Sequence, residues 1–202
     1  MALCLVFSYQ AILTHAANYL APEKLGKSDV VILEGAQLIK EKPVHDAMAL
    51  LSSGMANRMV IVIQQDPTNE RSFALSNYSH LITKDLEALG LHENQFQVIA
   101  VPANHPVTLT EAKIVLANLS KSNVRSAILM ADGFHTRRSF WVYRQVGRPL
   151  GIEIISCPYF VKHPRKAWWR TVDGCYEFIS ESLKLFYYVI MGYIPVKSLL
   201  VT

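Results

Sequence analysis

The stretch SAILMADGFHTRRS, residues 126–139, decides the fold of this chain. Its apolar start predicts a buried strand, Gly133 predicts a turn, and residues 136–146 predict a helix. The first turn of that helix carries one histidine and two arginines, although a helix N-terminus favours negative charge. Cations and backbone N–H groups gathered in this way are typical of a site for an anion, such as a phosphate or carboxylate. The alternative is that both arginines point into solvent.

The same alternation of strand and helix continues along the chain. Apolar runs predict strands at 29–33, 59–63, 96–101, 126–131 and 152–157, and helical periodicity predicts helices at 43–53, 71–89, 108–119, 136–146 and 174–191. Apolar strands separated by helices are typical of a parallel sheet that is covered on both faces. We therefore predict an α/β fold, a Rossmann-like three-layer sandwich with a mostly parallel five-stranded sheet and right-handed crossovers.

Length and composition indicate one domain. The 202 residues, 51% of them hydrophobic, are enough for a substantial core. We predict a single α/β domain over residues 1–202, in which 1–27 form an apolar helical segment, 28–157 form the sheet core and 158–202 form an aromatic-rich loop and helix.

Charge and cysteine content exclude two classes of protein. Residues 1–120 hold 8 Lys/Arg and 11 Asp/Glu, whereas residues 121–202 hold 12 and 5. This basic excess is too small for a dedicated nucleic-acid binder, and no DNA- or RNA-binding motif is present, so we predict no nucleic-acid partner. Three cysteines without a CxxC pair exclude a full disulfide framework and favour a reducing compartment. We therefore predict a cytoplasmic protein, with a membrane-associated location in the cell envelope as the alternative.

Both ends of the chain leave a second interpretation open. Residues 1–21 are apolar but lack a basic n-region and are too polar for a membrane span, so they predict a helix that packs on the core or, alternatively, contacts a membrane. The aromatic C-terminal region, with Lys162, Arg165, Lys166 and Arg170, predicts core packing or, alternatively, peripheral contact with a membrane or partner.

Four polar loops are predicted to meet where the parallel strands end. They span residues 34–37, 64–70, 102–110 and 132–138. Ligands of open α/β sheets bind beyond the carboxyl ends of the strands, at the switch in strand order. The chain has no GxGxxG, GxxxxGK[ST] or GxSxG pattern, which argues against a standard dinucleotide fold, a P-loop NTPase and an α/β-hydrolase.

The loop after the fourth strand holds the strongest candidates. His135 could act as an acid, a base or an anion ligand, and Asp132 could orient it. Arg138 lies one helical turn from His135 on the same face, so the two could hold one anion together with Arg137. The alternative is that His135 caps the turn and Arg138 pairs with an acidic neighbour.

The other loops supply weaker candidates. Glu34 is a candidate catalytic residue, and the candidate ligand-binding residues are Gly35, Gln37, Glu70, Thr108 and Thr110. The alternatives are a turn glycine beside a solvated Glu34 and a capping box in which Thr108 and Glu111 satisfy the helix start. Glu34, Glu70, Asp132 and His135 could converge on a metal, but their spacing matches no metal motif, so we assign no metal ligand.

These residues carry a resemblance to a known family. Its elements here are Glu34–Gly35 after the first strand, Ser53–Gly54, Glu70, Thr110–Glu111–Ala112, Phe134–His135 with Arg138, and Trp168–Trp169 followed by Glu177, Glu181 and Tyr187. Over residues 28–193 the chain resembles the YdcF/SanA/ElyC family of bacterial α/β proteins. The resemblance implies a Rossmann-like fold, S-adenosylmethionine as a candidate cofactor, and a role in envelope integrity or lipid-carrier steps.

Taken together, the sequence predicts a protein that binds a small anionic ligand, phosphorylated or nucleotide-like, at the carboxyl edge of the sheet. The resemblance places this activity in bacterial envelope or surface-polysaccharide metabolism. Two alternatives stay open, a non-catalytic membrane-adjacent accessory protein and a metal-dependent hydrolase. The sequence predicts neither the reaction nor the oligomeric state.

Overall fold

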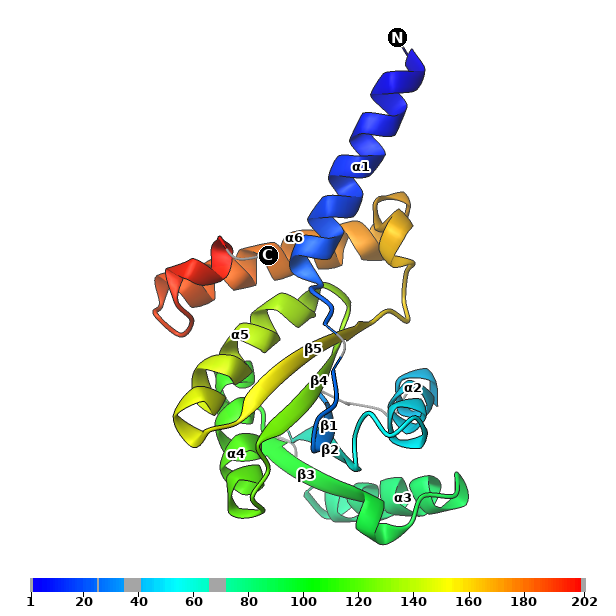
Figure 1. Cartoon of the computed structure of the whole chain (residues 1–202), viewed down its shortest axis with the longest axis vertical. Helices are drawn as coiled ribbons and strands as arrows, with labels where there is room; N and C mark the ends of the chain where they lie inside the picture. Colours follow the sequence, from blue (N-terminus) through cyan, green and yellow to red (C-terminus); the bar gives the residue numbers. More distant parts are fainter. Residues whose placement is uncertain (1, 25, 35–40, 66–71, 201–202) are drawn as a thin grey trace.

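The computed structural model describes residues 2–24, 26–34, 41–65 and 72–200 (Figure 1). Its strands are β1 (Val30–Leu33), β2 (Arg58–Gln65), β3 (Phe96–Pro102), β4 (Ser126–Asp132) and β5 (Glu153–Tyr159). They form one sheet in the order β3-β2-β1-β4-β5, and every neighbouring pair is parallel. The predicted Rossmann-like α/β fold is confirmed, and the sheet is parallel throughout.

Helices cover both faces of the sheet. They are α1 (Ala2–Leu20), α2 (Glu41–Ser52), α3 (Ser72–Ala88), α4 (Val107–Lys121), α5 (Thr136–Gly147) and α6 (Val172–Ile190). Val44 of α2 and Leu86 of α3 pack in one apolar core, and Leu116 of α4 and Val142 of α5 pack in the other. Because successive side chains point to opposite faces of a strand, β1 contributes to both cores, with Val31 in the first and Ile32 in the second.

The central position of β1 creates the predicted switch point. β1 pairs with β2 on one side and with β4 on the other, so Leu33 lies opposite Met130. Glu34 follows directly and donates its backbone N–H to the Met130 carbonyl at 3.0 Å. The residues that follow β1 and β4 therefore lie side by side at the carboxyl edge, where parallel α/β sheets bind ligands.

Two helices lie outside the layers at one end of the molecule. Figure 1 shows α6 lying across that end, with α1 rising past it and projecting away from the body. The last turns of α1 pack on the core, where Ala17 and Leu20 are buried, whereas Ile12 is exposed. The prediction of a core-packing helix is therefore right for the end of α1. Among the residues described, no helix is long and apolar enough to cross a bilayer.

Candidate functional site

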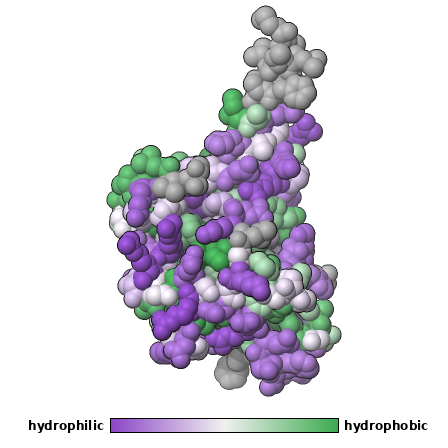
Figure 2. Space-filling view, in the orientation of Figure 1, coloured by the Kyte–Doolittle hydropathy of each residue, from purple (hydrophilic) through white to green (hydrophobic). Residues whose placement is uncertain are grey.

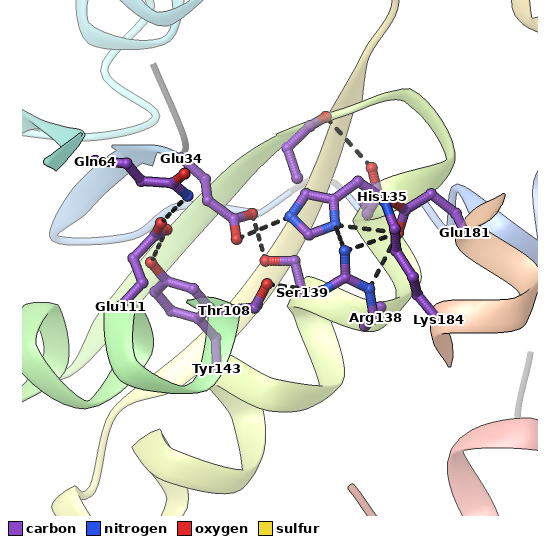
Figure 3. Close-up of polar contacts among 12 residues, drawn as sticks. Glu34, Gln64, Thr108, Glu111, His135, Arg138, Ser139, Tyr143, Glu181 and Lys184 are labelled. Carbon is purple, nitrogen blue, oxygen red and sulfur yellow. Dashed lines mark hydrogen bonds and ion pairs between the residues drawn. The ribbon is translucent and has the colours of Figure 1, made fainter. Parts of the chain in front are cut away.

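The site begins with a histidine held between two carboxylates. His135 Nε2 lies 3.1 Å from Glu34 Oε1, and His135 Nδ1 lies 3.4 Å from Glu181 Oε2 (Figure 3). Glu34 comes from the end of β1 and Glu181 from α6, so residues far apart in sequence hold one ring. Both carboxylates are buried, whereas 24% of the His135 side chain is exposed. The two carboxylates thus hold the His135 ring on its buried side, and the other side of the ring is exposed.

A tight turn delivers His135 to this position. After β4 the chain forms a single 3₁₀ turn, Gly133–His135, that leads into α5. Gly133 has a φ of +51°, and a Cβ there would clash with the Glu177 carboxylate. The same carboxylate accepts the backbone N–H of Phe134 at 2.9 Å and contacts His163 Nε2 at 3.1 Å. Glycine is required here both by backbone conformation and by the approach of Glu177.

Arg138 ties the histidine to two helices. Its guanidinium donates to Glu181 Oε2 at 2.9 and 3.0 Å and to Thr108 Oγ1 of α4 at 2.7 Å. Nη2 also lies 2.8 Å from His135 Nδ1, and the guanidinium lies 4.9 Å from the centre of the Tyr188 ring. Buried arginine–carboxylate contacts of this kind fix geometry as well as charge. Arg138 therefore serves mainly to position His135 and Glu181.

A second polar layer lies behind Glu34. Ser139 of α5 donates a hydrogen bond to Glu34 Oε2. Glu111 is fully buried on α4 and accepts from Tyr143 and from Gln64, both at 2.9 Å. Burial, with the nearby charge of Glu34, raises the pKa of Glu111 to about 8. Burial therefore favours the neutral form of the Glu111 carboxyl.

Neighbouring charges shift the pKa values of His135 and Glu181. Burial and the charge of Arg138 disfavour charged His135, but the Glu34 charge and the hydrogen bonds to Glu181 and Glu34 outweigh them, so the pKa of His135 rises to about 9. Burial alone would raise the pKa of Glu181, yet His135, Arg138 and Lys184 hold it well below its usual range. Arg138 and Lys184 thus face the Glu181 carboxylate, and His135 lies between Glu181 and Glu34. The cleft wall adds Lys162 and three more carboxylates, Asp132, Asp173 and Glu177, so cations and carboxylates are closely matched here.

The open side of His135 faces a cleft of about 250 Å³. The cleft lies between the turn after β4 and α6, and its lining residues are Asp132, His135, Lys162, Asp173, Tyr176, Glu177, Ser180, Glu181 and Lys184. Its wall mixes cations with carboxylates, so it suits a ligand that carries an anionic group together with hydroxyl or amino groups. Glu177 and Glu181 already bind groups of this chain, which limits the carboxylates available to a ligand.

A second groove is larger and more basic. It has a volume of about 650 Å³ between α5 and β5, and its charged residues are Lys24, Arg144, Arg148, Glu153 and Lys197. This groove contains none of the buried carboxylate–histidine contacts found at the carboxyl edge. Because buried charge clusters beside a cleft are typical of functional sites, we take the His135 cleft as the candidate site.

Arg137 is not part of this site, contrary to the prediction. It is 1% exposed and points away from the cleft, donating to the carbonyls of Tyr19 and Ser198. Its guanidinium also lies 3.8 Å from the centre of the Tyr19 ring. Successive helix residues point about 100° apart, so Arg137 reaches α1 and the C-terminal segment while Arg138 reaches α6. The alternative prediction, that Arg138 pairs with an acidic neighbour, is confirmed.

The capping box expected at Thr108 and Glu111 is wrong. α4 begins at Val107 with Pro106 as its N-cap, and no side chain caps it. Thr108 instead accepts from Arg138, and Glu111 belongs to the layer behind Glu34. Thr110 is half-buried on the same helix and adds no contact to the cluster among the residues described.

The remaining predicted residues divide into two groups. Asp132 lines the cleft, but the contacts that hold the His135 ring come from Glu34, Glu181 and Arg138. Gly35, Gln37 and Glu70 lie outside the described residues. Among the described residues, no group of three or more His, Cys, Asp or Glu side chains could hold a metal ion.

The sequence prediction of the site missed several residues that the fold supplies. They are Lys184 of α6, Ser139 and Tyr143 of α5, and the cleft residues Asp173 and Tyr176. Glu181 is among the residues that carry the family resemblance, but the sequence prediction gives it no role in the site. One signal was present, since Glu177 and Glu181 are four residues apart and so share one face of a largely apolar helix. Two carboxylates on one face of such a helix indicate a partner cation elsewhere in the fold.

A scan against protein-family models, a search of curated proteins and a search of solved structures each found no match for this chain.

Proposed function

We propose that this protein binds a small molecule with an anionic group, phosphorylated or nucleotide-like, in the cleft beside His135. The observation that carries the proposal is the His135 ring, fixed by Glu34 and Glu181 on its buried side and exposed to the cleft on the other. A preorganised histidine ring binds a ligand without the entropic cost of ordering a free side chain.

The cleft also limits the chemistry of the ligand. Lys162 and Lys184 stand with His135 as cations, while Asp132 and Asp173 offer carboxylates to hydroxyl or amino groups. Nucleotides and sugar phosphates combine these features. S-adenosylmethionine does so as well, because it joins a carboxylate and an amine to ribose hydroxyls. A role in bacterial envelope or surface-polysaccharide metabolism follows from the family resemblance, which adds polyprenyl phosphates to the set of probes.

The test is a thermal-shift panel with S-adenosylmethionine, nucleoside mono- and diphosphates and short-chain polyprenyl phosphates. A ligand that binds the folded state raises its melting temperature, and the rise grows with the logarithm of the ratio of ligand concentration to Kd. We expect at least one probe to stabilise the wild type and to lose that effect in His135→Gln. Arg144→Gln, which alters the second basic groove, is the matched control and should keep the shift. The proposal fails if no probe shifts the wild type, or if Arg144→Gln loses the shift and His135→Gln keeps it.

A further inference from the structure

The outer face of α6 is an apolar surface that the described part of the chain leaves uncovered. Six residues along the whole helix are each more than half exposed: Val172, Tyr176, Ile179, Leu183, Phe186 and Ile190. Their spacing of four and three residues places them on one line along the helix. We call this line the α6 stripe. Exposed hydrophobic surface of this extent is uncommon on a monomeric domain and marks an interaction site.

The opposite face of α6 packs on the body of the molecule. Glu177 and Glu181 point into the His135 site, and Leu185 and Phe178 pack in the core with α1 and α5. The α6 stripe is therefore on the side opposite the body of the molecule. Figure 2 shows hydrophobic surface over the C-terminal end of this helix. The exposed side chains of Val196 and Leu200 continue the surface beyond α6.

The projecting helix α1 emerges at the same end of the molecule. Figure 1 shows α1 rising past α6 and away from the body, so a flat surface laid on α6 would meet the projecting part of α1. The sequence of α1 contains no Asp, Glu, Lys or Arg. Residues 2–12 of a helix extend about 16 Å, roughly half the thickness of a bilayer hydrocarbon core. This geometry suits entry into one leaflet and obstructs close packing of a second flat protein face.

Charge at the ends of α6 favours an anionic partner. Lys166 and Arg170 are exposed before the helix, and Lys197 is exposed after it. Asp173 is the one exposed acidic residue in the described part of residues 160–200. Cations beside an apolar helix face are typical of helices that lie in the interface of a membrane with anionic lipids.

We propose that the α6 stripe docks on the surface of a bilayer that contains anionic lipids, with α6 in the plane of the interface and the projecting part of α1 entering the leaflet. The proposal does not depend on the proposed ligand. It does orient the His135 cleft, because Tyr176 belongs to the stripe and also lines the cleft. The cleft then opens beside the lipid headgroups.

The test is co-sedimentation of the full chain with vesicles of phosphatidylcholine alone and of phosphatidylcholine mixed with phosphatidylglycerol. We expect binding to the anionic vesicles that decreases with salt, and a roughly tenfold or greater loss of partitioning in Leu183→Glu, which replaces a buried leucine with a charge in the docked state. Leu81→Glu is the matched control, because Leu81 is similarly exposed but lies on α3. It should bind as the wild type does.

Three outcomes would overturn the proposal. The first is absence of vesicle binding by the wild type, and the second is binding that Leu183→Glu leaves intact. The third comes from analytical ultracentrifugation without vesicles. A wild-type dimer that Leu183→Glu dissociates, combined with no binding to vesicles, would make the α6 stripe an interface between copies of this chain. Circular dichroism melts of both variants establish that the substitutions leave the fold intact.

Discussion

Arg137 and Arg138 are consecutive residues with opposite surroundings. Both lie in the first turn of α5 and both are buried. The acceptors that hold Arg137 are the neutral backbone carbonyls of Tyr19 and Ser198, whereas Arg138 meets a carboxylate, a hydroxyl and a histidine. Arg137 joins α5 to α1 and the C-terminal segment, and Arg138 joins α5 to α4 and α6.

The difference shows how one unusual sequence feature can serve two purposes. Two arginines at a helix N-terminus are unfavourable for the helix itself, so each must be compensated by the fold. The charge of Arg137 is compensated by backbone carbonyls that lie away from the cleft. Arg138 is compensated by Glu181, which also contacts His135. We therefore expect substitutions at the two positions to separate stability from binding.

The largest effect should come from Arg138→Leu. Removing the guanidinium leaves the buried Glu181 carboxylate with weaker compensation and leaves Thr108 without its donor. Breaking a buried ion pair in this way costs about 3–5 kcal/mol of unfolding free energy. Urea denaturation measures the loss, and ligand binding should disappear with it. A loss below about 1 kcal/mol would show that Glu181 does not depend on Arg138.

A smaller effect is expected from Arg137→Met. The substitution removes the donors to two backbone carbonyls but leaves no carboxylate uncompensated, so the cost is about 1–3 kcal/mol. Urea denaturation is again the measurement. The ligand-induced shift in melting temperature should match that of the wild type. If Arg137→Met abolished binding while it stayed folded, the contrast between the two arginines would be wrong.

The pH dependence of stability sharpens the account of the Arg138 region. The folded-state pKa values of His135, about 9, and Glu111, about 8, both exceed their ordinary values. The folded protein therefore retains protons that the unfolded chain releases. For Glu111 the stability falls as pH rises from its ordinary pKa to about 8, and for His135 from its ordinary pKa to about 9.

The effects of His135 and Glu111 overlap just above neutral pH. There each group lowers the unfolding free energy by about 1.4 kcal/mol per pH unit. Glu111→Gln removes one of the two, so we expect the slope of unfolding free energy between roughly pH 6.5 and 8 to fall by about half. Urea denaturation over this range measures it. An unchanged slope in Glu111→Gln would show that Glu111 is already ionised in the folded protein at neutral pH.

Much of the fold could be predicted because its signals are local. The apolar runs of β2 and β4 cannot be exposed, and the helices between them leave a parallel sheet as the consistent arrangement. The same topology predicted that Glu34 and His135 meet, since both follow parallel neighbouring strands. These two residues are the part of the site that the sheet alone determines.

The rest of the site depends on contacts between distant elements. Glu181 enters from α6, 43 residues after Arg138, and nothing near either residue in sequence indicates the pairing. The directions of Arg137 and Arg138 depend likewise on where α1 and α6 pack. Thr108 and Glu111 matched a local capping pattern, but in the structure they accept hydrogen bonds from Arg138 and Tyr143 and do not cap the helix. Local sequence patterns thus predicted where the site lies, whereas tertiary packing determines what each residue does there.

The most direct test of the central claim is an NMR titration of isotopically labelled protein with adenosine monophosphate and S-adenosylmethionine. The account predicts saturable shifts of the His135 ring signals and of the Phe134 and Lys184 amides, with the Arg144 amide unchanged. Shifts confined to the surroundings of Arg144 would contradict it, because the ligand would then occupy the basic groove between α5 and β5 and not the cleft at the carboxyl edge of the sheet.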